Sequence, residues 1–343
     1  MSGVNRARGR PATLAESPSR HDNGVPAERP GQPNLTSIDA KRANAPALTA
    51  GGIRHAPREA GGFMEPQSHS VLHRGLKLHH VEWGWHPGKE PLLLLHGIRL
   101  HARVWDHFAL RIGQERRVLA LDARGHGDSD WAPGEYHLHD FYEDLLAVMD
   151  GRGIERAALI GHSLGGRVAL LFAHLHPERV SRLVLVDIGP ALPASALKRD
   201  FSRITETPHR SEFESVEAAV EYLASILTRA PRAMIEHSVK FGIRPGKNGS
   251  HTWKYDPSLG GPPLPRAGRR EWDLWEAAAS LTCPTLLLHG QHSQVVTADM
   301  ADRMSERIPD FRAIRVPDAG HALFTEQPEL FAEHVKAFLS EGA

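Results

Sequence analysis

The feature that most constrains this chain is a serine between two glycines, placed where an apolar strand gives way to an apolar helix. The segment runs from Leu159 to Leu170, with Ser163 between Gly161 and Gly165. Glycines two residues before and after a serine allow a sharp turn and a close approach of strand and helix, which exposes the hydroxyl at the end of a sheet. Gly-x-Ser-x-Gly alone also occurs in ordinary turns, but the flanking strand and helix favour a nucleophile elbow.

Composition allows a large core and excludes several classes of function. The 343 residues are 41% hydrophobic, with 41 basic and 41 acidic side chains and no net charge. This balance argues against a nucleic-acid partner, and no apolar run approaches the roughly 20 residues that span a bilayer, so no membrane partner is expected. The single cysteine, Cys283, excludes an intramolecular disulfide and fits a cytoplasmic location. We expect a monomer or homodimer.

The first 66 residues differ from the rest of the chain. They are rich in Arg, Pro, Ala, Gly and Ser and have little hydrophobic periodicity, so we predict a disordered extension over residues 1–66. No apolar stretch follows the early arginines, which argues against a secretory signal. Recognisable structure begins after Met64, and whether the residues before it are translated stays open.

Strands and helices alternate over most of residues 67–341. The apolar run at 92–95 indicates a central strand covered on both faces. Further strands are predicted at 71–73, 76–83, 118–121, 157–160, 182–186, 284–290 and 313–316, and helices at 105–112, 140–152, 164–176, 298–307 and 328–339. This alternation predicts an α/β fold with a mostly parallel sheet and helices on both of its faces.

The regular alternation breaks at Pro190 and resumes after about residue 281. Helices are predicted within this interval at 194–204, 216–227 and 232–241. We therefore interpret residues 190–281 as an inserted, mainly helical cap. Its aromatic side chains either line an apolar pocket or belong to the core: Phe201, Tyr222, Trp253 and Trp272.

Linked motifs then occur in a characteristic order, namely His96-Gly97, Asp122–Ser129, the elbow, Leu185–Pro190, and Gly320-His321 followed by Glu326 and Pro328. In this combination the chain resembles the α/β-hydrolase superfamily, in its capped branch of small esterases and carbon–carbon bond hydrolases. The resemblance covers about residues 70–341. It implies an eight-stranded sheet, a small-molecule acyl substrate and no cofactor, and it is specific for the fold but much less so for the substrate.

The resemblance also suggests partners for the elbow serine, which needs a base because a free hydroxyl is essentially unionised at neutral pH. His321 is the candidate base, in the loop after the last strand where the family places its histidine. The backbone N–H groups of Ile98 and Leu164 are the expected oxyanion hole. We expect His162 to be scaffolding of the elbow. His96 has no partners at metal-ligand spacing, so no metal site is expected.

The acid is where this sequence departs from the family pattern. Relatives usually carry Gly-x-x-Ser-Asp after the seventh strand, but Gln294 stands at the position of that aspartate. A neutral amide can orient an imidazole but cannot stabilise an imidazolium. The best substitute is Asp187, at the end of the sixth strand, where some members of the superfamily place the acid; a turn-capping role is equally consistent with its position. Asp299 and Asp318 are weaker candidates.

Two further groups of charged residues have both a chemical and a structural interpretation. The segment Asp122–Ser129 crowds charges and glycines together, and we expect a structural loop in which Asp122 pairs with Arg124. Arg99 and Arg103 follow the oxyanion turn, where a guanidinium can hold a substrate carboxylate. Solvated surface arginine is the favoured interpretation for both.

These residues together predict a serine hydrolase that cleaves a carboxylic ester or related acyl compound through an acyl-enzyme. Carbon–carbon hydrolysis of a diketone is an alternative that the sequence does not separate from ester hydrolysis. A second alternative is a small-molecule-binding protein that lost catalysis together with its acid. The serine at the elbow argues against haloalkane dehalogenase and epoxide hydrolase chemistry, for which this fold uses an aspartate nucleophile.

Overall fold

The computed structural model describes residues 65–84, 86, 88–134, 136–191, 210–259 and 272–341. All of them belong to one compact unit, Pro57–Ala343. The extension predicted for residues 1–66 lies outside the described residues except for its last two positions. The helix expected at 194–204 and the side chain of Phe201 also lie outside them.

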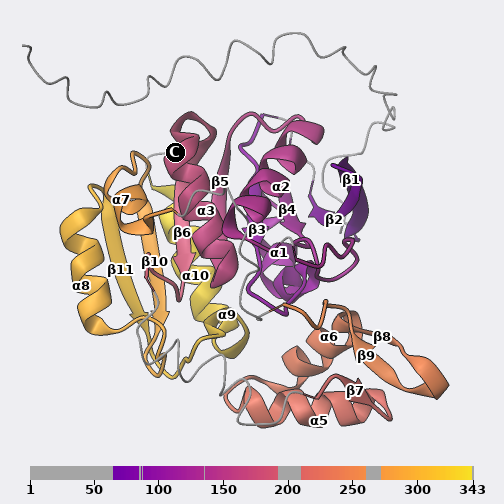
Figure 1. The fold of residues 1–343 in the computed structure, drawn as a ribbon. Helices are drawn as coiled ribbons and strands as arrows, with labels where there is room; N and C mark the ends of the chain where they lie inside the picture. The colour runs from indigo at the N-terminus through magenta and orange to yellow at the C-terminus, as the bar shows by residue number, and fades with distance from the viewer. Residues whose placement is uncertain are drawn as a thin grey trace, which may run out of the picture. The chain divides into compact units, whose positions relative to one another are not determined.

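An eight-stranded sheet forms the centre of the described chain (Figure 1). The strand order is β1-β2-β4-β3-β5-β6-β10-β11. Strand β2 is antiparallel to both β1 and β4, and every other pair in this sheet is parallel. The strands are β1 Gln67–His73, β2 Leu76–Trp83, β3 Leu92–Leu95, β4 Val118–Leu121, β5 Ala157–His162, β6 Val180–Val186, β10 Thr285–Gly290 and β11 Phe311–Val316.

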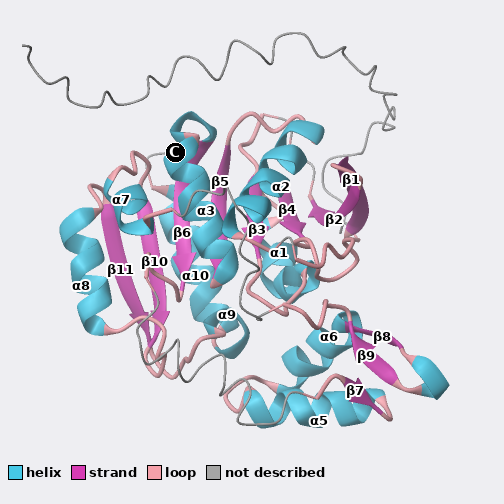
Figure 2. Cartoon of the chain, in the orientation of Figure 1, coloured by secondary structure: helices cyan, strands magenta, loops and turns pink. Residues whose placement is uncertain are grey.

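Helices cover both faces of this sheet (Figure 2). One apolar core contains side chains from α2, α3, α7 and α8, and a second contains side chains from α1, α9 and α10. The helices are α1 Asp106–Ile112, α2 Leu138–Gly151, α3 Leu164–Leu175, α7 Leu274–Ala279, α8 Ala298–Arg307, α9 Leu323–Glu326 and α10 Pro328–Ser340. The predicted fold class is therefore confirmed.

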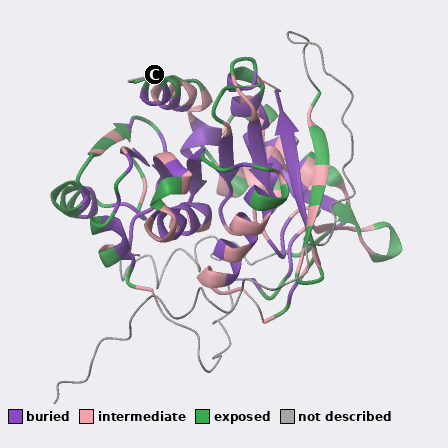
Figure 3. Ribbon diagram, turned by 90° about the horizontal axis from the view of Figure 1, so that it is seen from above, coloured by how far each residue is buried: buried purple, intermediate pink, exposed green. Residues whose placement is uncertain are grey.

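The leucines of β3 explain why a continuous apolar run forms the middle of the sheet. Leu93 and Leu95 belong to the first core, whereas Leu92 and Leu94 belong to the second. Successive strand residues point to opposite faces, so a strand covered on both sides needs an apolar side chain at every position. The central strands are buried along their length, while exposed residues lie on the outer helices, the loops and the edge strands β1 and β11 (Figure 3).

The described part of the insertion contains both helices and strands. Helices α5 Val216–Ile226 and α6 Arg232–Gly242 agree with the predicted ranges. Three short strands, β7 Glu212–Phe213, β8 Ile243–Pro245 and β9 His251–Trp253, form an antiparallel sheet that the sequence did not predict. Strands of two or three residues are too short to show a periodicity of two. Helix α7 was also not predicted.

The strand order indicates where a ligand would bind to this sheet. Strand β3 lies between β4 and β5. After β3 the chain continues to β4 on one side, whereas after β5 it continues to β6 on the opposite side. In open parallel sheets, ligands bind beyond the carboxyl ends of the strands at such a point. The turn that contains Ile98 follows β3, and Ser163 follows β5.

Candidate active site

Ser163 occupies a strained turn between β5 and α3. Its backbone angles are φ 51° and ψ −115°, and it is the N-cap of α3. A side chain on Gly161 would overlap the backbone of Gly165, and one on Gly165 would overlap the backbone oxygen of Leu95. Only glycine therefore allows α3 to approach β5 and β3 this closely. The expected elbow geometry is present in the structure.

His321 lies in the loop between β11 and α9, where two contacts hold its backbone. The N–H of Gly320 donates to the carboxylate of Glu326, and His162 Nε2 donates to the carbonyl oxygen of His321 at 3.0 Å. Its Nδ1 lies 2.7 Å from Oδ2 of Asp187. The His321 side chain is 31% exposed whereas Asp187 is fully buried, so the imidazole is accessible from one side and anchored on the other.

The carboxylate that meets His321 belongs to Asp187, at the carboxyl end of β6. Its Oδ1 accepts a hydrogen bond from the N–H of Gly290 at 3.0 Å, and its Oδ2 accepts the hydroxyl of Ser293. Asp187 thus joins β6 to the loop after β10 and contacts the imidazole as well. Among the described residues, the carboxylate contacts Gly290, Ser293 and His321 and not the turn into the insertion that the capping interpretation requires.

The other acid candidates lie elsewhere. Gln294 is exposed. The carboxylates of Asp299 and Asp318 are 81% and 84% exposed, and they lie near Arg303 and His292 respectively. Ser293 was not considered from the sequence, although its position in the Gly-x-x-Ser loop pattern was a usable signal.

The two expected oxyanion donors are backbone amides beside the elbow. Leu164 begins α3, where the helix dipole adds partial positive charge. Ile98 follows Gly97, and a Cβ on that glycine would lie 3.1 Å from Cβ of Ser163. Within the described residues, neither the Ile98 nor the Leu164 N–H has a hydrogen-bond acceptor. Both amides are therefore available to a bound oxygen.

Two buried histidines support this edge of the sheet. His96 donates through Nδ1 to the carbonyl oxygen of Gly97 at 2.7 Å and accepts the N–H of Ala123 at Nε2, which fixes the oxyanion turn. The His162 ring lies 4.5 Å from the ring of His321. Burial, together with the proximity of His321, holds the pKa of His162 well below its usual value, so its ring stays neutral. Both contacts agree with scaffolding roles.

The Ser163 hydroxyl and His321 are not hydrogen-bonded to each other among the described residues. Such bonds are often long without substrate and tighten in the reacting complex. The arrangement brings an imidazole with an anchored carboxylate, a strained serine and two open amides to one edge of the sheet.

The segment after β4 has a structural role, but its pairing differs from the expected one. Arg124 pairs with Asp144, with two contacts of 2.6 and 2.7 Å. Asp122 instead accepts hydrogen bonds from His79 Nδ1 at 2.7 Å and from the N–H of Ala102 at 2.6 Å. The predicted Asp122–Arg124 pair is thus wrong. Although burial alone would raise it, hydrogen bonding and the charge of His79 hold the pKa of Asp122 well below its usual value.

Potential metal ligands converge near this segment, where His79, Asp122 and Asp128 bring three ligand atoms within 4.8 Å of one another. Two of these atoms, His79 Nδ1 and Asp122 Oδ2, are close because they share a direct hydrogen bond. Asp128 is exposed and pairs with Lys254 at 2.8 Å. We therefore interpret this group as part of the structural loop.

The arginines after the oxyanion turn bind protein groups. Arg103 pairs with Asp106 at 2.6 Å and lies 3.9 Å from the centre of the Phe241 ring. Arg99 donates to the carbonyl oxygen of Leu259 at 3.3 Å. Both arginines connect the β3–α1 region to the inserted segment.

The aromatic residues of the insertion have mixed roles. Trp253 and Tyr222 pack against Phe213, with ring centres 5.1 and 5.4 Å from it. They therefore contribute to the small core of the insertion. Trp272 is partly buried against the first core of the main sheet.

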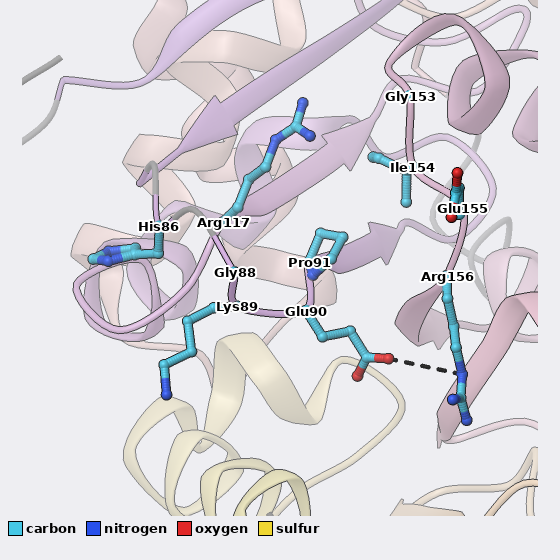
Figure 4. Close-up of a pocket in the computed structure, with 10 residues that line it drawn as sticks. All are labelled: His86, Gly88, Lys89, Glu90, Pro91, Arg117, Gly153, Ile154, Glu155 and Arg156. Atoms are coloured by element: carbon cyan, nitrogen blue, oxygen red, sulfur yellow. Dashed lines mark ion pairs between the residues drawn. The ribbon is translucent and has the colours of Figure 1, made fainter. Parts of the chain in front are cut away.

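A surface hollow of about 620 Å³ lies away from these groups (Figure 4). Its lining comes from the segments that precede β3, β4 and β5, including Lys89, Arg117 and Arg156. It therefore lies at the amino ends of the parallel strands, opposite the edge that carries Ser163. Binding sites in such sheets form at the carboxyl ends, so this hollow is not part of the candidate active site.

Comparison with known protein families identifies the fold. A family model described as "alpha/beta hydrolase fold" matches residues 90–328. The chain belongs to the α/β-hydrolase family. Its named relatives include hydrolases and esterases, and this chain is a hydrolase.

Individual relatives of this hydrolase differ in their chemistry. A 2-(acetamidomethylene)succinate hydrolase of Mesorhizobium japonicum is 28% identical over 253 residues, 74% of this chain and 89% of the relative. A pimeloyl-[acyl-carrier protein] methyl ester esterase of Nitrosomonas europaea is 31% identical over 248 residues, 70% of this chain and 92% of the relative. Epoxide hydrolase 4 of Mus musculus is 27% identical over 280 residues, 78% of this chain and 77% of the relative.

Solved structures agree with this assignment. The crystal structure of E-2-(acetamidomethylene)succinate hydrolase has a TM-score of 0.70 and 26% identity, and the match covers 80% of this chain and 99% of the other. An esterase of Mycobacterium tuberculosis has a TM-score of 0.63 and 27% identity, over 80% of this chain and 92% of the other. In the part of this hydrolase that the structure describes, no helix is long and apolar enough to cross a membrane.

Proposed function

We propose that this hydrolase cleaves a carboxylic ester or related acyl compound through an acyl-enzyme formed on Ser163. The contact between Asp187 Oδ2 and His321 Nδ1, at 2.7 Å, carries this proposal. A charged carboxylate on Nδ1 leaves Nε2 of the imidazole as the proton acceptor and stabilises the imidazolium that forms. In this proposal Asp187 takes the place of the aspartate that is absent at position 294, and its contact with His321 argues against a protein that only binds its ligand.

In the proposed mechanism, His321 takes the proton of Ser163 as the hydroxyl oxygen attacks the acyl carbon. The oxyanion that forms accepts hydrogen bonds from the N–H groups of Ile98 and Leu164, each worth roughly 3 kcal/mol in comparable sites. His321 then gives its proton to the departing alcohol, which leaves the acyl group on Ser163. A water activated by His321 attacks this ester and releases the acid. No step requires a cofactor.

Two observations favour acyl chemistry over the alternatives. The nucleophile position holds serine, and relatives named as esterases match about three quarters of this chain. No contact in the described residues specifically favours a diketone. We infer a small-molecule acyl substrate and a cytoplasmic location, which the single buried cysteine, Cys283, fits.

A fluorophosphonate probe tests the proposal directly, because an activated serine displaces its fluoride and becomes labelled. We expect labelling of the wild type, none of Ser163→Ala, and strongly slowed labelling of His321→Ala. His292→Ala is the matched control, since His292 is an exposed histidine on the neighbouring loop. A panel of para-nitrophenyl esters of increasing chain length then measures acyl preference. An unlabelled wild type, or equal labelling of Ser163→Ala, would refute the proposal.

A further inference from the structure

The loop after β10 supplies a hydroxyl to the same carboxylate oxygen that His321 contacts. Ser293 Oγ donates to Oδ2 of Asp187, and His321 Nδ1 lies 2.7 Å from that oxygen. The other oxygen, Oδ1, accepts the N–H of Gly290 at 3.0 Å. Both oxygens of the carboxylate are therefore held, which restricts its rotation about the Cβ–Cγ bond.

The Ser293 hydroxyl has one proton to donate, and its surroundings direct that proton to Asp187. The N–H of Val295 donates to Oγ of Ser293 at 3.0 Å. A hydroxyl that accepts from an amide on one side keeps its single proton for an acceptor on another side. The N–H of Ser293 donates to the carbonyl oxygen of Gly290 at 3.1 Å, which closes the turn.

The loop that carries this hydroxyl is tied to the segment that leads to His321. The N–H of Gln291 donates to the carbonyl oxygen of Val316 at 2.9 Å, and that of His292 donates to Ala319 at 2.8 Å. The same chain reaches His321 two residues after Ala319. The loop that carries the Ser293 hydroxyl and the segment that carries the His321 imidazole are thus hydrogen-bonded to each other.

Burial makes this hydroxyl important to the carboxylate. Asp187 is fully buried, so water cannot easily replace a lost donor, and a buried ionised group with fewer hydrogen bonds is costly. Without the hydroxyl, the carboxylate would also be free to turn its Oδ2 away from the imidazole.

We infer that Ser293 is a positioning residue, which keeps the Asp187 carboxylate turned toward His321. This inference rests on the proposed serine hydrolase function. In this chain the loop after β10 supplies the donor that supports the acid, while the adjacent strand β6 supplies the acid itself.

The test is a double-mutant cycle of Ser293→Ala and Asp187→Asn, read by the rate of fluorophosphonate labelling and by kcat and KM on a para-nitrophenyl ester. Ser293→Ala is expected to lower kcat and the labelling rate about tenfold, the effect of one hydrogen bond to a charged group, with KM nearly unchanged. Ser293→Thr keeps the hydroxyl and is expected to recover most of the loss. Gln294→Ala, on the same loop but exposed, is the matched control.

The cycle separates a positioning role from a structural one. If Ser293 acts through the carboxylate, Ser293→Ala changes the labelling rate less than twofold in the Asp187→Asn background. The same tenfold loss in both backgrounds, or wild-type rates for Ser293→Ala, would overturn the inference while leaving the proposed function in place. If the wild type is neither labelled nor hydrolytic, the proposed function fails first and this inference fails with it.

Discussion

Replacing Asp187 by asparagine tests the site most directly, because it removes one charge and keeps the shape of the side chain. The carboxylate is fully buried and lies 2.7 Å from His321 Nδ1. With charge centres about 4 Å apart and an effective dielectric constant of about 20, the imidazolium loses about 4 kcal/mol of stabilisation. That loss corresponds to about a thousandfold in rate. The equivalent amide substitution in a serine protease costs about ten thousandfold, partly through the wrong imidazole tautomer.

We therefore expect kcat of Asp187→Asn to fall about 10³- to 10⁴-fold on a para-nitrophenyl ester, with KM changed much less. The assay needs active-site titration of the wild type and a check by circular dichroism that the variant is folded. A folded Asp187→Asn variant with kcat within threefold of the wild type would refute the assignment. The reasoning from the Asp187–His321 contact would then be wrong, and the base would depend on another group.

Three further predictions concern the neighbouring loop, the elbow and acid stability. Gln294→Asp should change kcat less than threefold, because Nδ1 of His321 already has a carboxylate partner. Gly165→Ala should lower the free energy of unfolding by about 1–3 kcal/mol, measured in urea, because the added methyl overlaps the backbone of β3. Burial lowers the pKa of His101 to about 4 and of His126 to about 3. Because both fall below the unfolded value of 6.5, stability is full above about pH 6.5 and declines below it, by about 2 kcal/mol per histidine at pH 5.

Each of these predictions has a contrary outcome. A large gain from Gln294→Asp would mean that the natural site lacks an effective acid. Gly165→Ala with wild-type stability would mean that α3 can move away from β3 without cost. The free energy of unfolding, measured in urea at pH 7 and at pH 5, tests the prediction for His101 and His126. Equal stability at the two pH values would show that these rings are not buried in neutral form.

The sequence predicted the sheet and the elbow because their signals are local. The four leucines of β3, the strand–glycine–serine–helix pattern and the loop around His321 each occupy one short segment. The cap strands β7, β8 and β9 could not be predicted, since segments of two or three residues form strands only when Phe213 and its neighbours pack into a core.

The contact of Asp187 with His321 and the partner of Asp122 could not be established from the sequence, because each contact joins segments that lie far apart in the sequence. Asp187 and His321 are 134 residues apart, and their contact follows from the strand order β6-β10-β11, because Asp187 follows β6 and His321 follows β11. The partner of Asp122 comes from β2, 43 residues earlier. A single sequence contains the candidates for such contacts but not the strand order that selects among them.

The residues that follow the neighbouring strands β5 and β6 both have a positive φ angle, which costs free energy in the folded state. Ser163 has φ 51° and Asp187 has φ 49°, a region that side chains other than glycine occupy at a cost of about 1–3 kcal/mol. Glycine would relieve that cost at position 163, whereas at position 187 it would also remove the hydrogen bonds from Gly290 and Ser293 to the buried carboxylate. If Ser163 is the nucleophile, the fold and the chemistry make opposite demands on position 163, and this hydrolase would become harder to unfold by giving up that hydroxyl.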